Sequence, residues 1–308
     1  MTTAAVIVTY NSADCIGGCL AAAAPCVDRV VVVDNASGDD SVAKARAFPG
    51  ATVIANARNR GFAAAANQGV VASAAEMILL LNPDVILQTP VDDLVQACRR
   101  PGIAAAAGKL ADGAGKAQEG FTVRRFPGPA ALSFESLGVN RLWPGNPVNR
   151  RYRCADLNLE QTQRVEQPAG ALLLFRRDLW ERLGGFDQRF HPLWFEDVDF
   201  MKRTHEAGYA AIYTPSVWGT HSGGHSIPSI GERERRYFWY GNLLLYAAKH
   251  FGFWGLRATA ASVALGGAVR MLLAAGGGYG AVVRLAGAVL FCGPECLDGG
   301  ARRARQLN

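Results

Sequence analysis

Three carboxylates lie close together in the segment "WFEDVDF", directly after two aromatic residues. Glu196, Asp197 and Asp199 precede a helical stretch that runs to Gly208. One acidic side chain is enough to favour a helix N-terminus, so three exceed what capping requires. Carboxylates crowded into a partly apolar setting have raised pKa values, which suits a general base. We therefore predict that at least one of these carboxylates accepts a proton in a catalytic reaction.

A further carboxylate follows a proline at the end of an apolar stretch. The run "LLLNPDVIL", residues 79–87, has the composition of a buried strand and is interrupted by Asn82-Pro83-Asp84. A turn is the simplest explanation of these three residues. The alternative is a functional one, in which the fixed φ of the proline presents Asp84 rigidly at the tip of a strand.

Two histidines occur in the Gly/Ser-rich segment "SVWGTHSGGHS". His221 and His225 follow a predicted strand and are expected in a loop, where a histidine has little hydrophobic core to pack against. The spacing alone leaves two possibilities open for His221, a metal ligand or a structural side chain.

The elements that must position these residues alternate between strand and helix over the first hundred residues. We predict strands at "AAVIVTY" (4–10), "RVVVVDNAS" (29–37), "ATVIAN" (51–56) and "EMILLLNPD" (76–84), separated by helices. Continuous apolar strands separated by helices indicate an α/β fold with a parallel sheet covered on both faces. In such a sheet ligands bind beyond the carboxyl ends of the strands. Polar residues stand at all four ends: Thr9-Tyr10-Asn11, Asp34-Asn35, Asn56 to Asn59, and Asn82-Pro83-Asp84.

The glycine motifs that cradle phosphates are missing from these strand ends. The first strand leads into Asn11-Ser12-Ala13-Asp14 rather than G-x-G-x-x-G, and the P-loop motif is absent from the sequence. Hydride transfer with a dinucleotide and P-loop phosphoryl transfer are therefore disfavoured. If the sheet binds a nucleotide, a metal ion on a carboxylate is the expected means of holding its diphosphate.

Residues 109–164 are rich in glycine, proline and arginine, and are expected to form loops over the site or a solvated basic surface. Regular structure resumes with a predicted strand at 171–175 and a short helix at 178–183, which ends at Gly184-Gly185.

Composition limits the class of protein and its partners. The chain has 308 residues, half of them hydrophobic, and a formal net charge of +6, which suits an anionic partner. RNP-like segments and zinc-knuckle spacings are absent from the sequence, so nucleic acid is disfavoured. Seven cysteines and a first strand with no signal peptide before it are typical of a reducing cytosol.

The last third of the chain is apolar, yet arginines divide it. Arg257, Arg270 and Arg284 interrupt the apolar runs, which we expect to be shorter than the roughly 18 residues needed to span a membrane. Its many aromatic and basic residues are typical of helices at a lipid–water interface, and helices packed on the domain have the same composition.

Taken together, the motifs resemble those of family 2 glycosyltransferases. "VIVTYNS", "VVVDNASGDDS", "NRGFAAAANQG", "LLLNPDV", "GALLLFRRDLWERLGGFDQRF", "WFEDVDF" and H-x-x-G-x-S at 221–226 occur in the order of that family. The similarity covers roughly residues 4–245 and is greatest to the rhamnosyltransferase-like branch.

This resemblance implies a GT-A fold and a reaction. Residues 1–245 would form the glycosyltransferase domain, with a nucleotide-binding half (1–108) and an acceptor-binding half (109–245), followed by a helical C-terminal extension (246–308). The reaction would move a sugar from a nucleotide-diphosphate donor to an acceptor hydroxyl with inversion, in cell-surface polysaccharide synthesis.

The resemblance also implies roles for single residues. Asp197 matches the base that deprotonates the acceptor, with Glu196 beside it. Asp84 matches the last carboxylate of the D-x-D metal motif, whose first Asp is replaced here by Asn82, and His221 matches a histidine that completes the metal site in some relatives. The nucleotide-sugar pocket would further include Thr9, Tyr10, Asp34, Asn59 and Gly61, and the metal would be Mg²⁺ or Mn²⁺.

The implied partners are a nucleotide sugar and a glycan or polyprenyl-diphosphate-linked acceptor. The protein would act in the cytoplasm, in peripheral contact with the inner face of the cell membrane. Rhamnose is the sugar that the branch suggests, and UDP- or GDP-linked sugars remain open. Two alternatives remain, a nucleotidyl or phospho-sugar transferase and an inactive carbohydrate- or lipid-binding homologue.

Overall fold

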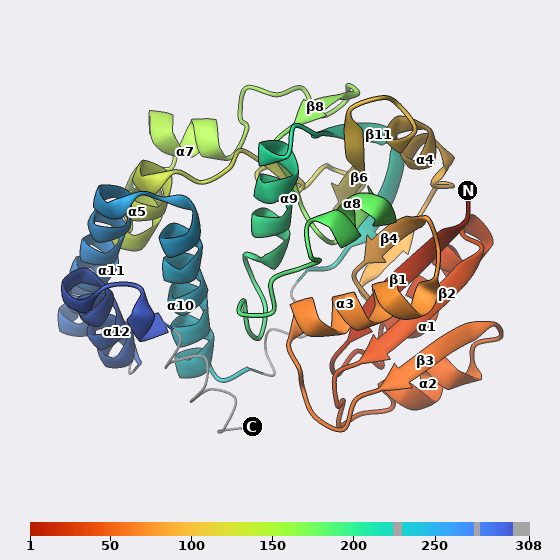
Figure 1. Cartoon of the computed structure of the whole chain (residues 1–308), viewed down its shortest axis with the longest axis horizontal. Helices are drawn as coiled ribbons and strands as arrows, with labels where there is room; N and C mark the ends of the chain where they lie inside the picture. Colours follow the sequence, from red (N-terminus) through yellow and green to blue (C-terminus); the bar gives the residue numbers. More distant parts are fainter. Residues whose placement is uncertain (224–229, 274–277, 298–308) are drawn as a thin grey trace.

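The computed structural model describes residues 1–223, 230–273 and 278–297. Its centre is a mixed sheet in the order β3-β2-β1-β4-β10-β6-β11-β5 (Figure 1). These strands are β1 Thr3–Thr9, β2 Arg29–Asp34, β3 Ala51–Ala55, β4 Met77–Leu81, β5 Val85–Leu87, β6 Ile103–Ala111, β10 Leu172–Arg176 and β11 Ala210–His221. Strand β8 (Gln163–Val165) pairs with β11, and β7 (Val123–Arg124) pairs with β9 (Gln167–Pro168) in a small second sheet.

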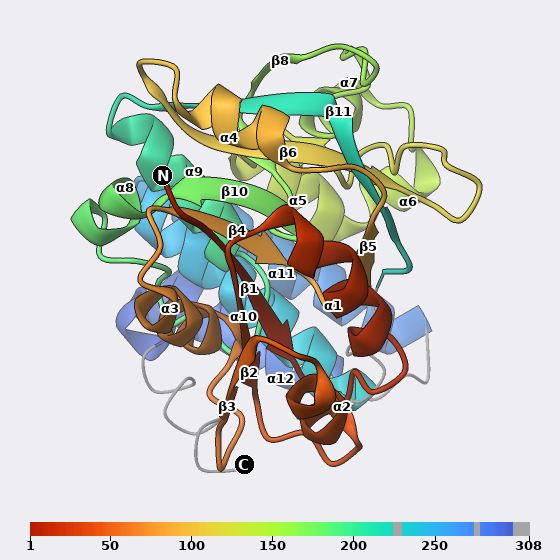
Figure 2. The ribbon, with the colours of Figure 1, turned by 90° about the vertical axis from the view of Figure 1, so that its right-hand side faces the viewer.

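The N-terminal part of the sheet is parallel, as the sequence predicts. Strand β1 pairs in parallel with β2 and β4, and β2 pairs in parallel with β3. Every residue of β1 and β4 is buried, because helices cover both faces of the sheet (Figure 2). Helices α1 (Ile16–Ala23), α2 (Ser41–Ala47) and α4 (Asp92–Cys98) contribute to the core on one face, and α3 (Phe62–Ser73), α8 (Arg177–Arg182) and α9 (Glu196–Glu206) contribute to the core on the other. A short 3-10 turn, η1 (Ala24–Cys26), follows α1.

Strand β10 enters the middle of this sheet from much later in the chain. It pairs antiparallel with β4 on one side and with β6 on the other, with Leu172 opposite Leu81. An apolar run such as "LLLF" fits a buried strand in either direction, so the sequence could not specify this orientation. The residues before β10 are thereby brought beside the Asn82-Pro83-Asp84 turn.

The expectation of loops throughout residues 109–164 is wrong in part. Three helices lie there, α5 (Pro129–Leu137), α6 (Val139–Leu142) and α7 (Pro147–Tyr152). Both boundaries of α5 have a local cause, since Pro129 occupies its first turn and Gly138, with φ of 81°, ends it. Proline at the start and glycine just past the end are the usual helix signals, and the sequence contains both.

A helical bundle forms the C-terminal side of the molecule (Figure 1). Helices α10 (Glu232–His250), α11 (Phe253–Leu273) and α12 (Tyr279–Cys292) share a core with α5 and with the segment that begins α9. The division expected at residue 245 falls inside α10 and stays a prediction. By length and composition α11 could cross a membrane. We did not expect this, because arginines interrupt the apolar sequence. A third of the most apolar 18-residue stretch of α11 is buried inside the fold.

Candidate active site

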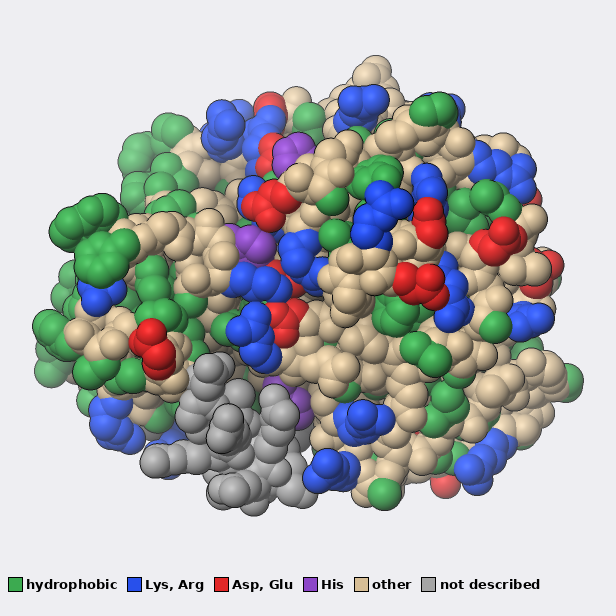
Figure 3. Space-filling model, viewed as in Figure 1, with side chains coloured by type: hydrophobic (Ala, Val, Ile, Leu, Met, Phe, Trp, Pro, Cys, Tyr) green, Lys and Arg blue, Asp and Glu red, His purple; other side chains and the backbone are tan. Residues whose placement is uncertain are grey.

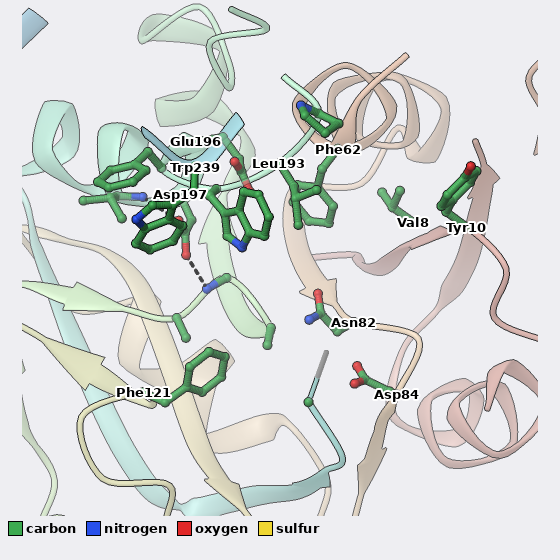
Figure 4. Close-up of a pocket in the computed structure, with 18 of the residues that line it drawn as sticks. Val8, Tyr10, Phe62, Asn82, Asp84, Phe121, Leu193, Glu196, Asp197 and Trp239 are labelled. Carbon is green, nitrogen blue, oxygen red and sulfur yellow. Dashed lines mark hydrogen bonds between the residues drawn. The ribbon is translucent and has the colours of Figure 1, made fainter. Parts of the chain in front are cut away.

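A cavity of about 290 Å³ lies at the carboxyl ends of the parallel strands (Figure 4). Its walls come from the ends of β1, β2 and β4 on one side and from the start of α9 and from α10 on the other. Seven of the ten predicted site residues line it: Tyr10, Asn59, Asn82, Asp84, Glu196, Asp197 and His221. Residues more than 130 positions apart in the sequence therefore meet at one site.

Asp84 and His221 lie together on one side of this cavity. Both side chains are buried, and Nε2 of His221 lies 3.5 Å from Oδ1 of Asp84. The expectation of a loop position for His221 is wrong, because it is the last residue of β11, where the ring of Phe121 stacks on it. His225 and the rest of the H-x-x-G-x-S motif lie outside the described residues.

The hydrogen bonds of Gln118 fix the tautomer of His221. The Gln118 amide nitrogen donates to the backbone carbonyl of His221 at 2.8 Å, so its amide oxygen is left to accept a hydrogen bond from Nδ1, 2.9 Å away. Burial lowers the pKa of His221, against the opposing effect of the Asp84 charge, so the ring is neutral at pH 7. Its Nε2 then carries a lone pair and has no hydrogen-bond partner.

Two hydrogen-bond acceptors thus face each other at 3.5 Å, an arrangement that a cation between them would stabilise. A carboxylate and an imidazole suit a divalent transition metal such as Mn²⁺. The described residues contain no group of three His, Cys, Asp or Glu side chains that could hold a metal. A cation held by Asp84 and His221 would therefore need further ligands from bound substrate, consistent with Asn82 in place of a first aspartate.

Asp197 stands on the opposite side of the cavity, near Trp239 (Figure 4). Its Oδ2 accepts a hydrogen bond from the backbone N–H of Gly170 at 2.9 Å, and its Oδ1 accepts one from the N–H of Val198 at 2.8 Å. Burial raises its pKa, while these hydrogen bonds and the charge of Arg124 act in the opposite direction. Part of the side chain remains exposed toward the cavity, where a substrate proton could reach it.

Glu196 differs from its neighbour in environment. The side chain is 6% exposed, and its Oε2 has no hydrogen-bond partner. Burial, reinforced by the negative charge of Asp197, raises the pKa of Glu196 well above its ordinary value. Of the two carboxyls, Glu196 is therefore the one held protonated and Asp197 the one suited to accept a proton.

The loop before α9 is held in a strained conformation. Trp194 and Phe195 both have left-handed backbones, with φ of 80° and 73°, which costs of order 1–3 kcal/mol for each residue. The side-chain amide of Asn242 in α10 donates to the carbonyl of Leu193 at 2.8 Å, with longer bonds to the carbonyls of His191 and Trp194. This one amide connects the loop before Asp197 to the C-terminal bundle.

Two consecutive residues connect the two sides of the cavity. Ala171 accepts a hydrogen bond from the backbone N–H of Asn82 at 3.0 Å, and the preceding Gly170 donates to Asp197. Gly170 has room for little else, because a Cβ there would lie 3.1 Å from the Cβ of Asp197. The spacing between the Asp84 turn and Asp197 is thus fixed by one stretch of backbone.

Three predicted site residues do not line the cavity. Asp34 is buried and accepts hydrogen bonds from the Thr9 hydroxyl at 2.8 Å and from the N–H of Ser37 at 2.9 Å. Gly61, with φ of 83°, brings the chain against His191, whose Nδ1 would lie 2.6 Å from an added Cβ. In this structure Thr9, Asp34 and Gly61 support the cavity wall, and their contact with a nucleotide stays a prediction.

Several cavity residues were not singled out from the sequence. Asn35 was noted only as part of a strand tip, and Arg124 and Trp239 were not singled out. Gln118, which holds His221 but does not line the cavity, was not singled out either. A polar residue after a strand was a usable signal for Asn35. The others lie in segments whose placement depends on tertiary packing, so their spacing carried no signal.

A parallel sheet with a buried carboxylate at a strand end, and a second carboxylate across the cavity, is the arrangement expected of a nucleotide-sugar transferase. The family model described as glycosyl transferase family 2 matches residues 4–183, more than half of the chain. The chain belongs to glycosyl transferase family 2. Sugar transfer is therefore its class of reaction, as the sequence predicts.

Curated relatives include a rhamnosyltransferase and an O-antigen biosynthesis protein. The chain is 28% identical over 268 residues to the N-acetylglucosaminyl-diphospho-decaprenol L-rhamnosyltransferase of Mycobacterium tuberculosis, covering 81% of this chain and 85% of the relative. It is 29% identical over 141 residues to the O-antigen biosynthesis protein RfbC of Myxococcus xanthus, covering 45% of this chain and 10% of that protein.

Solved structures confirm the GT-A-like mixed α/β fold. The mannosyltransferase PcManGT from Pyrobaculum calidifontis, in complex with GDP-Man and Mn²⁺, superposes with a TM-score of 0.54 at 21% identity, covering 96% of this chain and 81% of that one. GalNAc-T7 with UDP, GalNAc and Mn²⁺ gives 0.54 at 13% identity, covering 79% and 51%.

Proposed function

We propose that this protein transfers a sugar, rhamnose in the first instance, from a nucleotide diphosphate to a polyprenyl-diphosphate-linked glycan in cell-surface polysaccharide synthesis. The mycobacterial relative, whose name gives such an acceptor, supports the choice of sugar and acceptor. The observation that carries the proposal is the placement of Asp84, His221 and Asp197 around one cavity, with residues 170–171 between the two sides.

We assign the donor diphosphate to the side of the cavity formed by Asp84 and His221. These two residues would hold Mn²⁺ or Mg²⁺, and the bound cation would neutralise the charge that builds on the leaving diphosphate. Tyr10, Asn35 and Asn59 line the part of the cavity at the ends of the first strands, where a nucleotide binds in open α/β sheets.

Asp197 acts as the general base. Its carboxylate takes the proton of the acceptor hydroxyl as that oxygen bonds to the anomeric carbon of the donor sugar. The bond from that carbon to the phosphate oxygen breaks, and the electron pair leaves with the nucleoside diphosphate. The acceptor oxygen approaches from the Asp197 side of the cavity, opposite the departing phosphate, so the configuration of the anomeric carbon is inverted. The N–H groups of Gly170 and Val198 hold the carboxylate in place while it is charged.

The function is tested with purified full-length protein, Mn²⁺ and a panel of dTDP-, UDP- and GDP-sugars, with an alkyl-diphosphoryl-GlcNAc as acceptor. We expect glycosylated product and nucleoside diphosphate in equal amounts with one of the donors. Release of nucleoside monophosphate would instead identify a phospho-sugar transferase. Asp84→Asn should bind the donor with an affinity that Mn²⁺ no longer increases, measured by calorimetry with and without the metal.

We also propose peripheral contact with the membrane through α11. The exposed residues of α11 are all apolar, and six of them recur at helical spacing: Trp254, Ala258, Ala261, Leu265, Val269 and Leu272. We call this face the α11 surface. Hydrophobic side chains gather over α11 and α12 in Figure 3. An outward helix face is normally polar, and an apolar one with Arg257 beside it suits an anionic lipid surface.

Vesicle flotation tests this contact. The protein should float with vesicles containing phosphatidylglycerol, and Leu265→Ser with Leu272→Ser should abolish flotation. The matched control is Val71→Ser, which removes a similarly exposed apolar side chain from α3. Equal flotation of all three proteins would refute the assignment of the α11 surface.

A further inference from the structure

Arg124 occupies an unusual position in the cavity wall. It is the last residue of β7, it is half-buried, and it lines the cavity. Its Nε donates to the backbone carbonyl of Gly120 at 2.7 Å. The guanidinium lies over the rings of Phe121 and Tyr152, 5.6 Å and 5.9 Å from their centroids. The side chain is therefore fixed by contacts that leave its charge unneutralised.

The neighbouring arginine shows what Arg124 lacks. Arg125 forms an ion pair with Asp156 at 2.6 Å and is 3.9 Å from Glu166. Within the described residues no carboxylate lies within ion-pair distance of Arg124, and its two terminal nitrogens make no hydrogen bond. Burying part of a cation whose N–H groups have no acceptor costs free energy, unless an anion binds to it. In a substrate cavity, that anion would come from the substrate.

The position of Arg124 indicates which of the two substrates would supply this anion. In the β7–β9 pairing it stands opposite Gln167, whose side-chain amide is 3.5 Å from Oδ2 of Asp197. Its positive charge is one of the effects that oppose the raised pKa of Asp197. Arg124 therefore lies beside the base, on the side of the cavity that receives the acceptor.

We propose that Arg124 binds the diphosphate of the acceptor while the attacking hydroxyl of the same sugar lies at Asp197. In a sugar linked through its anomeric phosphate, the hydroxyl and the phosphate are carried by the same ring. Arg124 stands opposite Gln167 in the strand pair, and the side-chain amide of Gln167 is 3.5 Å from Oδ2 of Asp197. A guanidinium presents paired N–H donors that match phosphate oxygens. The residue would make the enzyme select diphosphate-linked sugars over neutral glycosides. This inference rests on the proposed function and specifies how its acceptor is recognised.

Two acceptors with the same sugar and alkyl chain test this role, an alkyl-diphosphoryl-GlcNAc and the neutral alkyl GlcNAc glycoside. Binding of each is followed by the fluorescence of Trp194 and Trp239, which line the cavity, and so needs no turnover. Arg124→Gln should weaken binding of the diphosphate acceptor by at least about tenfold, the effect of losing a hydrogen bond to a charged group. Binding of the neutral glycoside and of the donor should stay unchanged.

The matched control is Arg125→Gln, which removes the same charge from the next residue but not from the cavity. It should leave both acceptors unaffected. Equal weakening of both acceptors by Arg124→Gln, a selective loss of donor affinity, or no change would each overturn the proposal. A wild-type protein that binds the diphosphate acceptor through Arg124 but transfers no sugar would contradict the proposed function and leave this inference standing.

Discussion

Replacing Asp197 by asparagine removes the base while nearly preserving its shape. The carboxylate accepts two backbone N–H groups, from Gly170 and Val198, at 2.9 Å and 2.8 Å. An amide has one oxygen, so one N–H would face an NH₂ group, at a cost of about 1–3 kcal/mol. Burial raises the pKa of Asp197, so removing the charge recovers part of that loss. We expect the free energy of unfolding to fall by less than about 3 kcal/mol.

The effect on catalysis should be much larger. A positioned general base contributes about 10²–10⁴-fold to the rate, so kcat of Asp197→Asn should fall by about that factor. Donor binding should be unchanged, because Asp84 lies across the cavity from Asp197 (Figure 4) and His221 is 3.5 Å from Asp84. Initial rates at saturating donor give kcat, calorimetry with Mn²⁺ gives donor affinity, and thermal unfolding shows that the variant is folded.

The pH dependence gives an independent readout. The wild-type protein should lose kcat/KM as the pH falls through the pKa of Asp197, and burial places that pKa above the ordinary aspartate value of 3.8. This acidic limb should be absent in Asp197→Asn. Glu196→Gln is the matched control, since an amide resembles the protonated carboxyl, and it should keep kcat within about tenfold. A folded Asp197→Asn protein with intact donor binding and less than a tenfold loss of kcat would refute the assignment of the base.

Three further predictions concern the residues around the cavity. The raised pKa of Glu196 means that the wild-type protein loses stability as the pH rises from the ordinary value of 4.5 through the raised folded value, so Glu196→Gln should increase Tm at pH 8 more than at pH 5. Gly61→Ala should lower the free energy of unfolding, measured with urea, by about 2–5 kcal/mol, because of left-handed strain and the contact with His191. Its control is Gly113→Ala, where an added Cβ meets nothing within 4 Å, and this change should alter stability by less than about 0.5 kcal/mol. Asn242→Ala releases the loop before α9 and should lower kcat by about 10–100-fold without changing donor affinity, and an unaltered kcat would show that this amide does not position the base.

The strands and their polar ends could be predicted because they depend on local composition. The β-branched runs that form β1 and β2 fit only buried strands, and parallel strands bring Tyr10, Asn59 and Asp84 to one edge of a sheet. The carboxylates at Glu196 and Asp197 were recognisable because three acidic residues exceed what a helix start needs. These parts of the site are determined by short stretches of sequence.

The remaining parts depend on contacts between distant segments. The burial of His221 results from the pairing of β11 with β5 and from the stacked ring of Phe121. Gln118 reaches that histidine from 103 residues away, and no motif marks it. Arg124 lines the cavity whereas Arg125 pairs with Asp156, and the sequence does not distinguish these two adjacent arginines. For α5 the sequence contains a helix start signal, Gly128-Pro129, and a stop signal, Gly138. The surrounding segment is so rich in glycine and proline that these signals do not stand out from a loop composition.

The insertion of β10 between β4 and β6 has a consequence for engineering this enzyme. The segment that would carry acceptor specificity also supplies a central strand, β10, to the part that would bind the nucleotide. The two parts therefore share one sheet and are not separate consecutive domains. Grafting the later segment of one family member onto the earlier segment of another would replace the middle of the sheet. Exchanges of specificity should succeed only when confined to the peripheral loops that surround this shared strand.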